Sequence, residues 1–190
     1  YTICDEAQTA PIYTNNSAAS ATKPAHHDFV YAASGNEITK HCGECNKLMG
    51  TATITATHSR YTDLPVSAVV NGTGDFVGDS FVITYTDAEG NSTTAAPTEI
   101  GSYTASFTVE GVTASADFTI SKGTMSVAVA PTATYEYGDT HVGKAISGKV
   151  VISGNEAVEI TGTWAWVDST TTATFTPDAE FIDLFETLAA

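Results

Sequence analysis

The alternation of apolar and polar side chains over residues 101–121 constrains the fold of this chain more than any other sequence feature. Apolar residues occupy every second position from Tyr103 to Val109, with threonine and serine between them. After Glu110-Gly111, a pair typical of a tight turn, the alternation resumes from Val112 to Ile120. A period of two is the mark of a half-buried strand. The pattern therefore predicts an antiparallel hairpin that buries Phe107 and Phe118.

Shorter alternating runs recur along the chain and predict further strands. They lie around Thr51–Thr57, Phe81–Tyr85, Met125–Ala130, Val158–Trp166 and Ala173–Thr176, with glycine- and asparagine-rich stretches between them. Asn71-Gly72-Thr73-Gly74 is one of the stretches interpreted as a turn. The exception is Phe181 to Leu188, where apolar residues follow a helical spacing and Asp178 could cap a helix. A short terminal helix and a truncated final strand both fit this segment. Short strands at this spacing predict an all-β chain of small antiparallel sandwiches.

The turn- and loop-rich stretches divide the chain into three predicted modules. Residues 1–57 contain the three cysteines and form a small β module with a loop-rich insertion. Residues 58–121 end in the strong hairpin, and residues 122–190 hold both tryptophans. Because the chain begins with Tyr1 rather than Met and carries no signal peptide, we expect a segment of a longer modular protein.

The charge of the chain excludes two classes of partner. Asp and Glu number 22 against 7 Lys and Arg, which gives a net charge of −15. Nucleic acids and anionic membranes bind basic surfaces, so neither is expected as a partner. No apolar run is long enough to span a membrane. About one residue in six is threonine, a residue that favours strands.

Several motifs resemble bacterial immunoglobulin-like repeats of the MBG type, which occur in surface proteins of Gram-positive gut bacteria. The second module carries Ala96-Pro97-Thr98 followed by Gly101-Ser102-Tyr103-Thr104-Ala105. The third carries Tyr137-Gly138-Asp139, Gly162-Thr163-Trp164-Ala165-Trp166 and Thr174-Phe175-Thr176-Pro177. The first is similar to a small unit in which His27, Phe29, Tyr31, Gly35 and Cys42 keep a fixed spacing.

The resemblance implies an immunoglobulin-like fold and an extracellular, non-enzymatic role as an adhesion, binding or spacer module. The partner would be a host protein, such as an immunoglobulin, or a glycan. In the family the last strand runs past the position of residue 190, so the third module would be truncated. An alternative is a carbohydrate-binding accessory region of a secreted glycoside hydrolase. The chain carries no G-x-S-x-G elbow, P-loop or G-x-G-x-x-G motif, so we predict that it is not an enzyme.

Cys42-Gly43-Glu44-Cys45 is the sharpest local motif. A Cys-x₂-Cys knuckle can direct two thiolates at one metal ion, and tetrahedral zinc needs four nitrogen or sulfur ligands. Cys4 with His26 or His27 would complete a structural zinc site. Such a site would stabilise a module that has few large apolar residues. A disulfide from Cys4 to Cys42 or Cys45, or free thiols, would fit the same residues, and the sequence leaves these alternatives open.

The aromatic residues of the third module offer a second candidate site. Trp164 and Trp166 lie two positions apart, on one face of one predicted strand. With Tyr135 and Tyr137 they could form a platform on which sugar rings stack. Large aromatic side chains are more often buried in a sandwich core, which is the competing interpretation.

Overall fold

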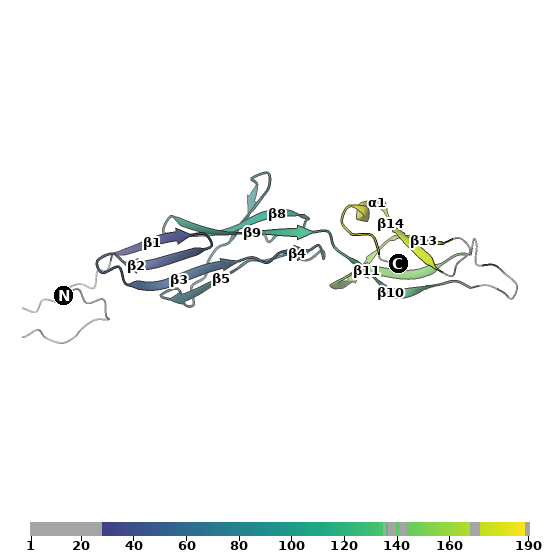
Figure 1. Cartoon of the computed structure of the whole chain (residues 1–190), viewed down its shortest axis with the longest axis horizontal. Coiled ribbons are helices and arrows are strands. Elements are labelled where there is room, and N and C mark those ends of the chain that lie inside the picture. The colour runs from purple at the N-terminus through teal and green to yellow at the C-terminus, as the bar shows by residue number, and fades with distance from the viewer. Residues whose placement is uncertain (1–27, 135, 137–139, 141–143, 168–171, 189–190) are drawn as a thin grey trace, which may run out of the picture. The chain divides into compact units, whose positions relative to one another are not determined.

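The computed structural model of this chain describes residues 28–134, 136, 140, 144–167 and 172–188. Within these ranges the chain forms fourteen strands, arranged in four sheets, and one helix of four residues (Figure 1). The sheets are built almost entirely from antiparallel pairs. The prediction of an all-β chain is therefore confirmed.

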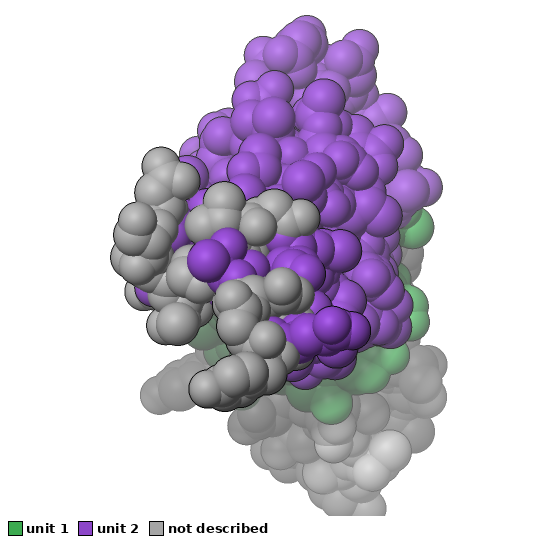
Figure 2. All heavy atoms as spheres, turned by 90° about the vertical axis from the view of Figure 1, so that its right-hand side faces the viewer, with its two compact units in different colours: residues 1–55, 69–83, 106–116 green, residues 56–68, 84–105, 117–190 purple. Residues whose placement is uncertain are grey.

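Contacts along the chain group it into two compact units, coloured separately in Figure 2. Unit 1 contains residues 1–55, 69–83 and 106–116, and unit 2 contains residues 56–68, 84–105 and 117–190. Each unit is assembled from separate stretches of sequence, unlike the contiguous modules 1–57, 58–121 and 122–190. The three-module division stays a prediction.

The sheet of unit 1 has the strand order β1-β2-β3-β5. Its strands are β1 (Phe29–Ser34), β2 (Glu37–Cys42), β3 (Leu48–Thr55) and β5 (Val69–Gly74), all paired antiparallel. The predicted turn at residues 71–74 is wrong, because these residues pair with β3 as part of β5. Glycine is needed here because the backbone of Phe76 packs directly against it. A Cβ at Gly72 would clash with the carbonyl oxygen of Phe76.

A chain of aromatic rings forms the interior of unit 1. Tyr31 contacts Phe76, Phe76 contacts Phe81, and Phe81 contacts Phe107 edge-on at 5.2 Å between ring centroids. Ile38 and Ile54 are fully buried, as the alternation of β2 and β3 requires. At the side of this sheet the Lys40 ammonium lies 2.9 Å from the Asp75 carboxylate and 3.9 Å above the Phe29 ring.

The five-stranded sheet has the order β4-β9-β8-β6-β7 and contains the predicted hairpin. Its strands are β4 (Ser59–Arg60), β6 (Thr84–Asp87), β7 (Ser92–Thr93), β8 (Gly101–Val109) and β9 (Val112–Ser121). β8 and β9 are joined only by Glu110 and Gly111, both with positive φ, as a type I′ turn requires. Phe107 is 2% exposed and Phe118 1% exposed, so the predicted hairpin and its buried face are confirmed.

The side chain of Tyr103 packs against Gly101, two positions before it in the sequence. Its hydroxyl donates to the carbonyl oxygen of Glu99 at 2.9 Å, and its ring stacks on Phe118 with centroids 5.5 Å apart. The side chain covers Gly101 so closely that a Cβ there would lie 3.3 Å from two ring carbons and from the hydroxyl oxygen of Tyr103. This hydrogen bond ties the start of β8 to the backbone just upstream of the strand.

The C-terminal part of unit 2 forms two small sheets. One has the order β10-β11-β12, from β10 (Met125–Thr132), β11 (Ser147–Ile152) and β12 (Asn155–Ile160). The other pairs β13 (Gly162–Trp166) with β14 (Ala173–Pro177), and helix α1 (Ala179–Ile182) follows. The alternation of β10 does not give a buried face, because two register shifts interrupt its pairing and leave Val127 44% and Val129 54% exposed.

Gly123 joins two parts of unit 2. Its N–H donates to the carbonyl of Leu184 at 2.9 Å, and its carbonyl accepts from the N–H of Glu186 at 3.0 Å. Beside it the ring of Tyr61 meets the buried ring of Phe185 edge-on at 5.6 Å. A Cβ at Gly123 would lie 2.4 Å from the Tyr61 carbonyl oxygen, so this joint can close only around a glycine.

Candidate functional site

The outward face of the five-stranded sheet is lined with hydroxyl side chains that pair across strands. Alternation along β8 and β9 places Thr104 and Asp117 on this face, opposite the rings of Tyr103 and Phe118. The Thr104 hydroxyl donates to Asp117 Oδ1 at 2.7 Å. Further pairs are Thr86 with Ser92 at 2.9 Å and Thr108 with Thr113 at 2.8 Å. Such pairs fix side-chain orientations on a surface that would otherwise be mobile.

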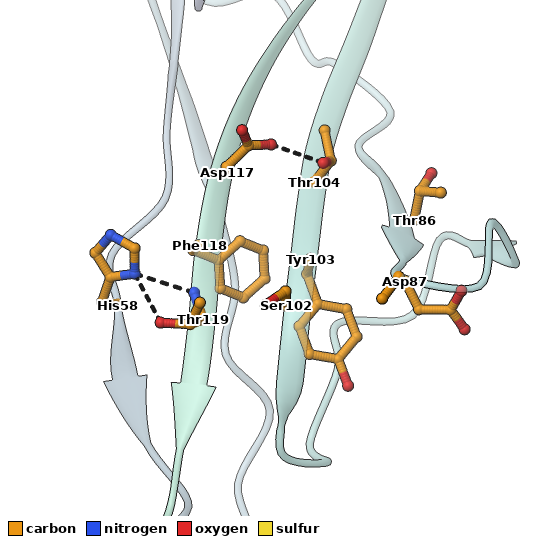
Figure 3. A pocket seen from close by; sticks show the side chains of 10 residues that line it. His58, Thr86, Asp87, Ser102, Tyr103, Thr104, Asp117, Phe118 and Thr119 are labelled. Atoms are coloured by element: carbon orange, nitrogen blue, oxygen red, sulfur yellow. Dashed lines mark hydrogen bonds between the residues drawn. The ribbon is translucent and has the colours of Figure 1, made fainter.

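This face is hollowed within unit 2, and Figure 3 shows the residues around the hollow. The hollow has a volume of about 300 Å³ and is open to solvent. Its lining comes from the segment before β4 and from β6, β8 and β9: His58, Thr86, Asp87, Ala88, Ser102, Tyr103, Thr104, Asp117, Phe118 and Thr119. Four stretches of sequence therefore build the hollow, and most of the residues that line it are polar.

His58 is held against the sheet by a single residue of β9. The backbone N–H of Thr119 donates to His58 Nδ1 at 3.1 Å, and the Thr119 hydroxyl lies 2.9 Å from the same nitrogen (Figure 3). A backbone N–H can only donate, so Nδ1 must carry a lone pair. In the neutral ring the proton is then on Nε2.

Two ionisable groups around the hollow have shifted pKa values. The side-chain amide of Asn91 bonds to the Asp87 carboxylate and, together with backbone N–H groups, lowers the pKa of Asp87. Burial, reinforced by Glu99 and nearby acidic residues, raises the pKa of the Tyr103 hydroxyl. The Asp87 carboxylate is thus used to close its own loop and Tyr103 stays protonated, which leaves Asp117 as the carboxylate directed at the hollow.

The predicted zinc ligands lie partly outside the described residues. Cys4, His26 and His27 fall there, so the structure does not test the set. Cys42 at the end of β2 is 2% exposed and is not in a disulfide bond, whereas Cys45 is in one. In the described part of the chain no three His, Cys, Asp or Glu side chains gather as a metal site would need. The zinc site stays a prediction.

The predicted aromatic platform is also only partly described. Tyr135 and Tyr137 lie outside the described residues, while Trp164 and Trp166 are both half-buried on β13. The Trp164 ring lies 5.1 Å from Phe175 on the paired strand. A Cβ at Gly148 would lie 3.1 Å from the same indole. Trp164 therefore takes part in packing on both sides, and whether the pair binds a ligand stays a prediction.

Sequence reasoning did not find the hollow. The alternation placed Thr104, Asp117 and Thr119 on the outward face, but threonine-rich faces occur all along this chain. His58 reaches Thr119 across 61 positions, and no local pattern encodes that approach. The only available signal was a histidine directly before a short strand, which is too weak to nominate a site.

Comparisons of the chain with protein-family models, with curated proteins and with solved structures find no match. Among the described residues, no helix has the length and apolar character needed to cross a bilayer.

Proposed function

We propose that this chain is a non-enzymatic segment of a secreted bacterial cell-surface protein, acting as an adhesion, binding or spacer module toward a host protein or glycan. The observation that carries the proposal is the outward face of the five-stranded sheet. It presents pre-oriented hydroxyl pairs and a solvent-open hollow on a rigid scaffold. Rigid elements that hold polar groups in place are well suited to recognition.

Three further features support this proposal. The hydrogen bond from Tyr103 to the Glu99 carbonyl resembles the tyrosine corner of immunoglobulin-like sandwiches. The Gly123 joint ties the residues after β9 to the segment around Phe185 within unit 2, which suits a spacer. The strongly acidic composition, with a net charge of −15, suits a solvated extracellular surface.

The second candidate is a carbohydrate-binding accessory region of a secreted glycoside hydrolase, favoured by the partial exposure of Trp164 and Trp166. Tryptophan fluorescence distinguishes the two proposals. If the tryptophans form the binding platform, a polysaccharide protects them from acrylamide quenching. Quenching that no polysaccharide alters would reject the tryptophan platform.

Surface display is the decisive test of the leading proposal. Antibodies raised against residues 28–188 should label intact, unpermeabilised cells that express the native gene, and should do so evenly around the cell. Labelling only after permeabilisation would refute a cell-surface role. A turnover screen with hydrolase substrates runs in parallel, because detected turnover would overturn the non-enzymatic assignment.

A further inference from the structure

The hollow on the five-stranded sheet carries two pre-oriented polar groups of opposite hydrogen-bonding character. His58 and Asp117 each use one atom to bond to the sheet, at Thr119 and Thr104, and are thereby fixed in orientation. We propose that this hollow is a binding site for an uncharged saccharide, held between the His58 imidazole and the Asp117 carboxylate. The inference rests on the proposed binding function and assigns that function a place and a ligand class.

The donor of the pair is His58 Nε2–H. Because the Thr119 N–H occupies Nδ1 at 3.1 Å, the neutral ring presents its only proton on the other nitrogen. The second contact, 2.9 Å from Nδ1 to the Thr119 hydroxyl, limits rotation of the ring. Figure 3 shows both contacts on the same edge of the imidazole, with the opposite edge directed away from the strand.

The acceptor of the pair is the Asp117 carboxylate. Its Oδ1 receives the Thr104 hydroxyl at 2.7 Å, and an ionised carboxylate has lone pairs for several further donors. Positions 117 and 119 lie on the same face of β9, so the two anchoring points are about 7 Å apart along the strand. In this proposal a sugar bound in the hollow donates one hydroxyl to the carboxylate and accepts the imidazole proton with another.

The acidic lining of the hollow favours uncharged saccharides over anionic ones. Lys and Arg are absent from the ten residues around the hollow, whose two carboxylates are Asp87 and Asp117. Sialylated, sulfated and phosphorylated glycans would meet this negative charge without a counter-charge. Asp87 already accepts hydrogen bonds from Asn91 and from the backbone N–H of Glu89, which hold its carboxylate in its own loop. Acceptor carboxylates beside the His58 N–H donor match an uncharged polyol.

The test is an NMR titration of the ¹⁵N-labelled chain with separate saccharides. The neutral probes are cellotetraose, laminaritetraose and lacto-N-tetraose, the anionic probe is sialyllactose, and the cationic probe is glucosamine tetraose. We expect at least one neutral probe to shift the amide signals of Thr104, Asp117 and Thr119 saturably. Asp117→Ala and Thr104→Val should each weaken that binding at least about fivefold, because each loses a fixed hydrogen-bonding group.

The matched control is Thr108→Val, which removes a hydroxyl of the Thr108–Thr113 pair on the same two strands but outside the hollow. It should leave the dissociation constant unchanged, and the dispersion of each variant's spectrum verifies folding. Three results would overturn the inference: no saturable shift at these amides up to about 20 mM of any neutral probe, binding that all three variants retain, or tighter binding of the cationic probe. None of these results bears on surface display, which antibody labelling tests separately.

Discussion

At the scale of single residues, Phe107 links sequence pattern to stability most directly. Its ring is 2% exposed and contacts Phe81 inside unit 1. Phe107→Ala should lower the free energy of unfolding by about 3–5 kcal/mol, because it removes a buried aromatic ring and leaves a cavity. Thr108→Ala, at the exposed neighbouring position, should change it by less than about 0.5 kcal/mol. Chemical denaturation of both variants measures the difference, and equal effects would contradict the burial of Phe107.

Asp87 provides a prediction in the acid range. The Asn91 amide and neighbouring backbone N–H groups lower the pKa of this carboxyl below its ordinary value of 3.8. The ionised form is thus favoured in the folded loop, so its stabilisation is present above the unfolded pKa and lost as the pH falls through the folded one. The protection factors of the Glu89 and Asn91 amides against hydrogen exchange, taken relative to the intrinsic rates at each pH, should fall in that window. Asp87→Asn should abolish this pH dependence, and its persistence would assign the effect to another group.

At the scale of elements, the turn of the β8–β9 hairpin contains an avoidable strain. Glu110 has φ of 46° and Gly111 φ of 80°, and a glutamate in this region is disfavoured. Glu110→Asn should stabilise the protein by about 0.5–1 kcal/mol, because asparagine tolerates positive φ in type I′ turns. Gly111→Ala should destabilise it. Thermal unfolding of the pair gives shifts of opposite sign, and shifts of the same sign would show that the turn adopts another conformation.

At the scale of the whole molecule, the Gly123 joint determines whether unit 2 unfolds as one body. A Cβ at this position would lie 2.4 Å from the Tyr61 carbonyl and 2.9 Å from the Phe185 ring. We expect Gly123→Ala to open the joint and to broaden or split the unfolding transition followed by calorimetry. Lys122→Ala, at an exposed neighbouring side chain, is the control and should leave a single transition. An unchanged transition in Gly123→Ala would contradict the role of the joint.

The cysteines support a prediction about how the N-terminal region is stabilised. The Cys42 thiol is buried and is not in a disulfide bond, Cys45 is in a disulfide bond, and Cys4 is the third cysteine of the chain. Without reductant, Cys42 should react with a thiol reagent only after unfolding, and peptide mapping should identify the partner of Cys45. Elemental analysis of protein purified without added metal tests zinc independently. About one zinc per chain, abolished by Cys42→Ser, would favour the zinc site over the disulfide.

The sequence by itself determined the strand class, the β8–β9 hairpin and the side of that hairpin that is buried. These properties follow from period-two alternation and from turn residues, which act over a few neighbouring positions. Local sequence misled at β5, where glycines typical of a turn serve close packing, and at β10, where register shifts cancel the alternation. Only the tertiary structure brought His58 to Thr119 and Tyr61 to Phe185, because these contacts join residues more than sixty positions apart. The hollow and the joint depend on such long-range contacts, which strand pairing creates and no local pattern encodes.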